Sequence, residues 1–249
     1  MSQDKFRETR RRFLHLSAAA GTAVMMVGCT DKSPAPGVRQ ASKDKDEKGG
    51  EVTAAEDLMR EHGVIRRALL IYTEVGARLR TDPGAVPPDA LQKTARLFRA
   101  FGEDYHERML EEAYIFPAVK IAGGPAAGLA DTLIAQHQRG REITDYILAV
   151  TQGAKLGAAN GGQLATAFDS LARMYRAHAA REDTIIFPAW KQTLSAGQLD
   201  EMNDKFEEIE HRQFGKDGFE DAVRQISDIE ASLVLGDLAA FTAPPPPKA

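Results

Sequence analysis

The sequence is poor in cysteine, with one residue, Cys29, in a chain of 249 that contains six histidines. A single cysteine excludes an internal disulfide framework and a cysteine-based zinc site. The formal net charge of −4 gives no general reason to expect nucleic acid or an anionic membrane surface as a partner. Alternation of apolar and polar residues over a useful length is also missing, so strands are not predicted. The charged fraction of 27% and hydrophobic fraction of 43% suit one globular domain with tails.

Residues 1–28 resemble an export signal. Three arginines at 10–12 precede an apolar stretch from about 16 to 27 that is too short to span a bilayer well. This order is similar to a twin-arginine signal. Residues 26–29, Met-Val-Gly-Cys, resemble a bacterial lipobox in which Cys29 is lipidated, with a coincidental buried cysteine or an uncleaved anchor as the alternative. The resemblance implies an exported periplasmic or cell-envelope lipoprotein that meets the membrane only through an N-terminal lipid anchor.

Two stretches are predicted to lack a packed core. Residues 29–52 hold several prolines and glycines, a charged run at 43–48 and almost no large apolar side chain, which is typical of a solvated tether. Residues 244–249 are rich in proline and are predicted to be a disordered tail. The folded domain is therefore expected at residues 53–243.

Start and stop signals divide this domain into six helices. Their expected ranges are about 54–81, 88–117, 124–152, 164–188, 196–214 and 218–233, with a glycine-containing loop at 153–162 before the fourth. Thr53 with Glu56, and Ser195 with Gln198, form capping-box patterns at two of the starts. Four long helices followed by two more predict an all-α fold, an up-down-up-down four-helix bundle with one or two additional C-terminal helices.

The fourth helix carries a histidine and a glutamate on its apolar face. His178 and Glu182 are four residues apart and therefore lie on one face, one turn apart. Their face is otherwise apolar, with Phe168, Leu171 and Ile185 on the same spacing. A buried imidazole and carboxylate need partners, which either a bound metal or a hydrogen bond and a salt bridge supplies.

Each of the four long helices carries one histidine at a similar depth: His62, His106, His137 and His178. In an up-down-up-down bundle, their positions bring all four to about one level. A single histidine on an apolar stripe is more often structural than a ligand. Four at one level, with two glutamates, are difficult to explain by packing, because each unsatisfied buried polar group costs about 1–3 kcal/mol.

This arrangement resembles the haemerythrin-like, or HHE, domain over roughly residues 53–191. The motifs that carry the resemblance are Glu61-His62, His106…Glu111-Glu112…Phe116-Pro117, Gln136-His137 and His178…Glu182-Asp183…Phe187-Pro188. The resemblance implies two irons with histidines as terminal ligands and carboxylates as bridges. The implied terminal ligands are His62, His106, His137 and His178, and the implied bridges are Glu111 and Glu182.

The second helix departs from the family pattern by one extra residue between His106 and Glu111. In a regular helix, residues five apart point about 140° from each other and could not share a metal. Either a π-bulge restores a common face, or Glu107, four residues before Glu111, replaces His106 as the ligand. We favour the bulge because it keeps four histidines at one level.

The third helix has Arg141 where oxygen-carrying haemerythrins have a further histidine. Both irons then keep open or water-filled positions, which favours reaction with O₂, a peroxide or NO over reversible carriage. The implied function is a non-haem di-iron protein of the bacterial envelope that binds or reacts with these molecules or handles iron. The alternative is a di-iron oxidoreductase, a peroxidase or NO-reducing protein. Iron over manganese rests on the resemblance, and no electron donor is predicted.

Two other interpretations of the histidines and glutamates fit the sequence. A ferritin-like iron site would use the Glu-x-x-His pairs Glu103/His106 and Glu208/His211, but it leaves three histidines without a role. A metal-free bundle is the other.

Among the remaining residues, His211 is predicted to lie off the apolar stripe of its helix. The tyrosines at 72, 105 and 175 are predicted to be core residues, with hydrogen bonding beside a metal as the alternative.

Overall fold

The computed structural model describes residues 52–153 and 156–247. In these ranges the secondary structure is helical and contains no strand, which confirms the all-α prediction. The predicted export signal, Cys29 and nearly all of the predicted tether lie outside the described residues. None of the described helices is both long and apolar enough to cross a membrane.

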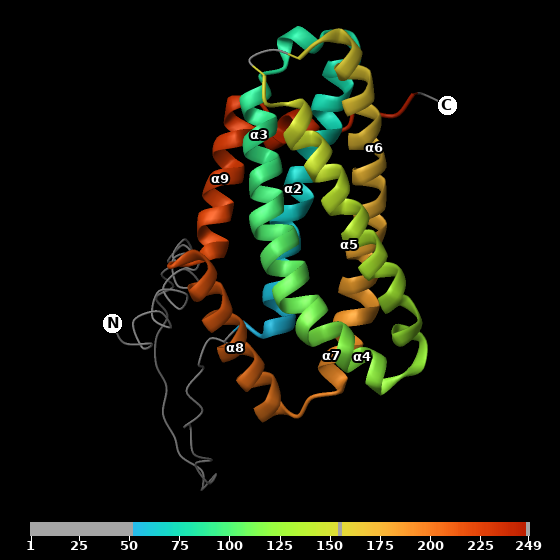
Figure 1. Ribbon diagram of the computed structural model, residues 1–249, viewed down its shortest axis with the longest axis vertical. Coiled ribbons are helices and arrows are strands. Elements are labelled where there is room, and N and C mark those ends of the chain that lie inside the picture. The colour runs from blue at the N-terminus through green and yellow to red at the C-terminus, as the bar shows by residue number, and fades with distance from the viewer. Residues whose placement is uncertain (1–51, 154–155, 248–249) are drawn as a thin grey trace, which may run out of the picture. The chain divides into compact units, whose positions relative to one another are not determined.

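Four long helical segments run alternately up and down and form the bundle (Figure 1). They are α2 (Ala54–Thr81); α3 (Pro88–Leu97) with η2 (Phe98–Ile115) and α4 (Phe116–Ala122); α5 (Gly124–Val150); and α6 (Ala158–Arg181) with η3 (Glu182–Ile186) and α7 (Phe187–Gln192). Two further helices, α8 (Ala196–Phe214) and α9 (Gly218–Ser232), pack against α2 and the α3–η2 segment. Two short 3-10 turns are η1 (Pro83–Ala85) and η4 (Leu238–Phe241).

Capping boxes fix two helix starts at the predicted positions. The side chains of Thr53 and Glu56 each accept a hydrogen bond from the other residue's backbone N–H, and Ser195 and Gln198 do the same at the start of α8. Helix α8 ends at Gly215, whose φ of 68° lies in the left-handed region that glycine adopts at little cost. Local sequence signals therefore placed these ends correctly.

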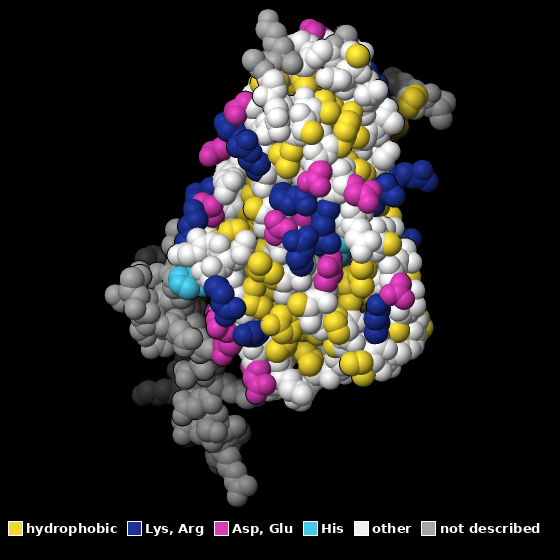
Figure 2. All heavy atoms as spheres, viewed as in Figure 1, with side chains coloured by type: hydrophobic (Ala, Val, Ile, Leu, Met, Phe, Trp, Pro, Cys, Tyr) yellow, Lys and Arg dark blue, Asp and Glu magenta, His cyan; other side chains and the backbone are white. Residues whose placement is uncertain are grey.

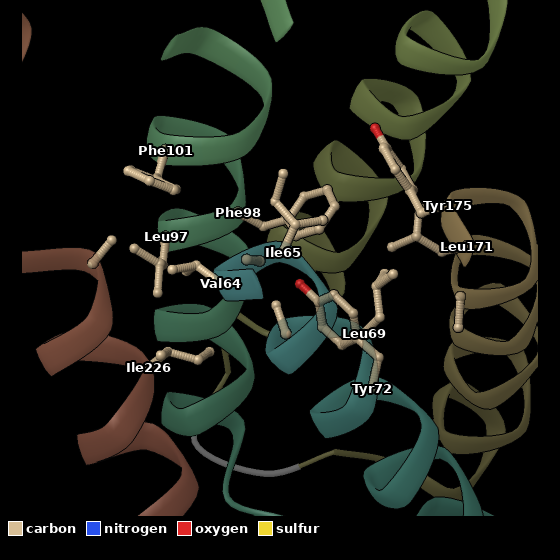
Figure 3. Close-up of a cluster of buried hydrophobic side chains, with 14 of the residues drawn as sticks. Val64, Ile65, Leu69, Tyr72, Leu97, Phe98, Phe101, Leu171, Tyr175 and Ile226 are labelled. Carbon is tan, nitrogen blue, oxygen red and sulfur yellow. The ribbon is translucent and has the colours of Figure 1, made fainter. Parts of the chain in front are cut away.

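The apolar core runs along the bundle on both sides of α2. Ile65, Leu69 and Tyr72 of α2 lie in one buried cluster with Phe98 of η2 and Leu171 of α6 (Figure 3). Full burial of such side chains contributes about 1.5–3 kcal/mol each. This packing holds the long segments side by side and so determines which inward-facing residues of different helices meet.

The two segments that contain Phe-Pro do not end where predicted. Phe116-Pro117 and Phe187-Pro188 are expected to close their helices, but the chain continues as α4 and α7. The N–H of each phenylalanine bonds to a carbonyl five residues earlier, that of Glu111 or Glu182, which is π-type geometry. Each proline then falls in the first turn of the next α-helix, where its missing N–H is tolerated.

The loop before the fourth long segment is shorter than predicted. Helix α6 begins at Ala158, so Asn160-Gly161-Gly162 is helical. A Cβ on Gly161 would lie 2.8 Å from Cγ of Pro83 and 3.2 Å from the carbonyl oxygen of Leu79. The prediction of a loop through residue 162 was wrong, because adjacent glycines usually mark a loop. Here Gly161 instead lets the start of α6 approach the end of α2 closely.

Replacing Gly161 by alanine is expected to lower the free energy of unfolding by about 1–3 kcal/mol, because the added methyl group meets Pro83 and backbone. The adjacent Gly162→Ala is the matched control. A Cβ there meets nothing within 4 Å, so this variant is expected to gain about 0.5–1 kcal/mol from helix propensity. Thermal unfolding of both variants checks the pair, and equal shifts would contradict the close approach.

Candidate metal centre

Six polar side chains meet inside the bundle, and they are the six ligands suggested by the sequence. They are His62 on α2, His106 and Glu111 on η2, His137 on α5, His178 on α6 and Glu182 on η3. None is more than 3% exposed. His62 and His106 form a first histidine pair, with ring centroids 4.7 Å apart, and His137 and His178 form a second pair, 4.8 Å apart.

The two glutamates lie between these pairs. One oxygen of Glu111 lies 3.3 Å from Nε2 of His106 in the first pair, and the other lies 3.3 Å from Nε2 of His137 in the second. Glu182 spans the pairs in the same way, at 3.5 Å from Nε2 of the first-pair His62 and 2.8 Å from Nε2 of the second-pair His178. Each carboxylate therefore presents one oxygen to each histidine pair.

Every histidine of the centre is oriented by a hydrogen bond at its outer nitrogen, Nδ1. The acceptors are Asp183 for His62 (2.7 Å), Glu61 for His106 (2.7 Å), Glu112 for His137 (2.9 Å) and Gln136 for His178 (2.9 Å). Partners of this kind fix the tautomer and the ring orientation of metal-ligating histidines. No role was predicted for these four acceptors, although each is the direct neighbour of a suggested ligand.

The interior of the centre is short of hydrogen-bond donors. Both carboxylate oxygens of Glu111 and of Glu182 are buried without a hydrogen-bond partner, as is Nε2 of His106. When the imidazoles donate outward from Nδ1, each neutral ring has a lone pair at Nε2, and Nε2 of His137 and Nε2 of His178 lie 3.0 Å apart. Lone pairs facing one another in a closed space require a cation or protons between them. Nitrogen and oxygen donors in this arrangement fit divalent iron or manganese, so the residues present fit a metal centre.

The pKa shifts report the same surplus of negative charge. Burial alone would lower the pKa of His137, but the charges of Glu107, Glu111 and Glu112 outweigh it and raise that pKa to about 10. Burial is likewise outweighed at His106, where Glu111 and Glu61 hold the pKa well above its usual range. The electrostatic field inside the centre therefore favours positive charge.

The helix that carries His106 has the π-type geometry that the extra residue requires. The whole of η2 is wide, rather than one turn of it, and it brings His106 and Glu111 to a common side. Glu107 points elsewhere, toward the second histidine pair, where it accepts hydrogen bonds from Tyr175 (2.6 Å) and Arg141 (3.2 Å). His106 rather than Glu107 thus faces Glu111.

Arg141 supplies positive charge to a further group of possible metal-binding side chains beside the centre. Glu107, Glu112 and His137 come close enough together to hold an ion. The guanidinium of Arg141 bonds to both of these carboxylates, at 3.2 Å and 2.5 Å. It therefore neutralises this group and does not enter the space between the two histidine pairs.

The Glu-x-x-His pairs of a ferritin-like site are not brought together. Glu208 and His211 are exposed on α8. Glu103 is buried, accepts a hydrogen bond from Thr144 and forms an ion pair with Arg99. The ferritin-like interpretation is therefore not supported by the geometry.

The three tyrosines singled out from the sequence are all buried but differ at the hydroxyl group. Tyr105 donates to Glu61 at 3.0 Å and Tyr175 donates to Glu107 at 2.6 Å. The hydroxyl of Tyr72 has no hydrogen-bond partner. Two of them therefore support carboxylates beside the centre, while the hydroxyl of Tyr72 supports none there.

The fold and the centre together define a helical-bundle protein with a candidate metal-binding site lined by histidines and carboxylates. The family model of the haemerythrin HHE cation-binding domain matches residues 53–190, and the chain belongs to this family. The chain is similar to "Uncharacterized protein Rv1995" of Mycobacterium tuberculosis H37Rv and "Uncharacterized protein Mb2018" of Mycobacterium bovis, with 42% identity over 234 residues to each, covering 94% of this chain and 90% of each relative. No solved structure matches the chain.

The outer hydrogen bonds yield a prediction for Asp183, which accepts from Nδ1 of His62. Asp183→Ala is expected to weaken metal binding by about 10–100-fold, because the imidazole loses the partner that orients it. Chelator competition at constant pH measures the change. Asp131→Ala is the control, since Asp131 is exposed and pairs only with Lys120 among the ion pairs of the described residues. Equal affinities of the two variants would show that the outer hydrogen bond does not matter.

Proposed function

We propose that this protein is a non-haem di-iron protein of the bacterial cell envelope that binds or reacts with O₂, NO or a peroxide, or handles iron. The observation that carries the proposal is the position of Glu111 and Glu182, each with one oxygen toward each histidine pair. Two carboxylates that span two pairs of imidazoles suit two metal ions held side by side. The preference for iron over manganese comes from membership of the haemerythrin family.

Small-molecule reactivity is supported by the number of ligands that the chain supplies. Each histidine pair would offer two imidazoles and two carboxylate oxygens to one metal ion, and a six-coordinate ion there would keep places for water or a small ligand. Arg141 is held by Glu107 and Glu112 and does not fill those places. Iron in such a site supplies one-electron redox chemistry and Lewis-acid binding of small ligands.

The alternative is a di-iron oxidoreductase, a peroxidase or an NO-reducing protein, that uses the same centre. Its support is the buried acid Glu107, which is hydrogen-bonded to Tyr175 and lies 3.9 Å from Nδ1 of His137. Turnover of peroxide or NO with an added reductant separates this alternative from a binding or sensing role. Binding without turnover would leave the first function.

Metal content tests the proposal directly. The purified protein is expected to contain about two irons per chain, one for each histidine pair, and its oxidised form is expected to show oxo-bridge charge-transfer bands. His178→Ala is expected to lose iron and these bands, because it removes half of the second pair. His211→Ala, at an exposed position on α8, is the matched control and is expected to keep both. Stoichiometric zinc, or no metal in the wild type, would overturn the proposal.

The envelope location rests on the twin-arginine and lipobox patterns before residue 30. The wild-type protein is expected in the membrane fraction of exporting cells, and Cys29→Ser is expected in the soluble fraction, because the lipid anchor is lost. Ser33→Ala, four residues away, is the control and is expected to fractionate like the wild type. Equal fractionation of Cys29→Ser and wild type would contradict lipidation at Cys29.

A further inference from the structure

Glu103 is a buried carboxyl group outside the metal centre. It lies on η2, eight residues before Glu111, and its side chain is 0% exposed. Ionisable side chains occupy every fourth position of this helix, at Arg99, Glu103, Glu107 and Glu111. The row begins at Arg99, whose side chain is 21% exposed, and ends at a suggested bridge of the metal centre.

On its outer side, Glu103 meets an arginine that is shared with the surface. Nε of Arg99 lies 3.0 Å from Oε2 of Glu103, but this oxygen has no hydrogen bond. Nη2 of Arg99 instead bonds to the exposed Asp145 at 2.5 Å and to the carbonyl of Arg141 at 2.9 Å. On the face seen in Figure 2, basic and acidic side chains gather midway along the bundle. Arg99 therefore connects the buried Glu103 to the exposed Asp145.

Residues that interact with Glu103 carry buried polar atoms without hydrogen-bond partners. These atoms are the hydroxyl of Tyr72 and Nε of Arg141, and Oε2 of Glu103 itself also has no hydrogen bond. Both residues act electrostatically with Glu103, and Nη2 of Arg141 reaches on to Glu107. Buried polar atoms without protein partners are normally bonded to internal water, so this buried polar layer suits ordered water beside Glu103.

The groups around Glu103 hold it near the balance between its two protonation states. Burial raises the pKa of Glu103 to about 7, although the hydroxyl of Thr144, which donates to Oε1 at 2.6 Å, and the charges of Arg99 and Arg141 lower it in part. The charged and titratable residues near it are Tyr72 on α2, Arg99, Asp104 and Glu107 on η2, Arg141 and Asp145 on α5, and Tyr175 on α6.

We propose that Glu103 is a proton carrier between solvent at the Arg99–Asp145 pair and the buried polar layer beside the metal centre. The proposal rests on the proposed function, because reduction of O₂ or a peroxide consumes protons. In the step, the O–H bond of the Glu103 carboxyl breaks and the proton passes to an adjacent internal water. The carboxylate that remains is balanced by Arg99 until a proton from solvent restores the O–H bond. Only a proton moves in this step, and the electrons for the reduction come from an external donor.

Infrared difference spectroscopy of the iron-loaded protein tests the first half of the proposal. A band from a protonated carboxyl is expected to disappear with a midpoint near pH 7 and to be absent from Glu103→Gln. Asp131→Asn, at an exposed position where the carboxylate pairs with Lys120, is the control and is expected to keep the band. A spectrum without such a band between about pH 5 and 9 would overturn the proposal. This result does not depend on reactivity, so it is separate from the proposed function.

A second variant leaves Glu103 in place and keeps the test decisive if Glu103→Gln does not fold. Thr144→Val removes the hydroxyl group that donates to the Glu103 carboxylate. The midpoint of the infrared band is expected to move upward by about one pH unit, because a hydrogen bond to the charged form is lost. An unmoved midpoint would show that the titrating carboxyl is not Glu103.

The second half is tested by the rate at which chemically reduced, iron-loaded protein is reoxidised by hydrogen peroxide between about pH 5 and 9. Glu103→Gln is expected to react at least about tenfold more slowly and to lose the change in rate near pH 7. The exposed-site control Asp131→Asn is expected to behave like the wild type. A Glu103→Gln variant with wild-type rate and pH profile would exclude the carrier role. If the wild-type protein binds two irons but does not react with a peroxide, O₂ or NO, the proposed reactivity and the carrier role are both overturned. The infrared titration then still decides whether Glu103 holds a proton.

Discussion

The structure depends on the burial of two carboxylates, Glu111 and Glu182, whose four oxygens have no hydrogen-bond donor. Ionised carboxylates in a closed core are costly unless positive charge is held between or beside them. Two histidine pairs face the oxygens with nitrogen lone pairs, since Nδ1 of each ring is engaged outside. A metal-binding centre is the arrangement that makes this burial favourable, and membership of the haemerythrin HHE family agrees with it.

The outer hydrogen bonds tie the helices to one another through this centre. Glu61, the neighbour of His62 on α2, accepts from His106 on η2, and Asp183, the neighbour of Glu182, accepts from His62. Each residue that orients a histidine therefore follows or precedes another suggested ligand in the sequence, and the histidine that it orients lies on a different helix. Displacement of one helix would disturb both its own ligand and that of its partner, so the bundle and the centre depend on each other.

Proline and wide helical turns place the two carboxylates. The carbonyls of Glu111 and Glu182 each accept from the N–H of the phenylalanine that precedes a proline, five residues on. In η2 the wide geometry also absorbs the extra residue between His106 and Glu111, so that both face inward. Arg141 then changes the surroundings of the second histidine pair, because it links Glu107 and Glu112 rather than providing another imidazole.

The sequence by itself determined the all-α bundle and the helix caps, because helical periodicity and capping are local properties of three to four residues. The six candidate ligands followed from the resemblance to the haemerythrin HHE motifs, with Glu107 left as the alternative to His106. The sequence also indicated π-type geometry near His106, since the spacing to Glu111 fits no regular turn. It did not determine the continuation past Pro117 and Pro188, or the helical start around Gly161, where packing outweighs the usual meaning of proline and glycine. Only the tertiary structure decided which residues accept hydrogen bonds from the histidines, where Arg141 lies and what surrounds Glu103. The reason is that these features are mostly contacts between residues far apart in the chain.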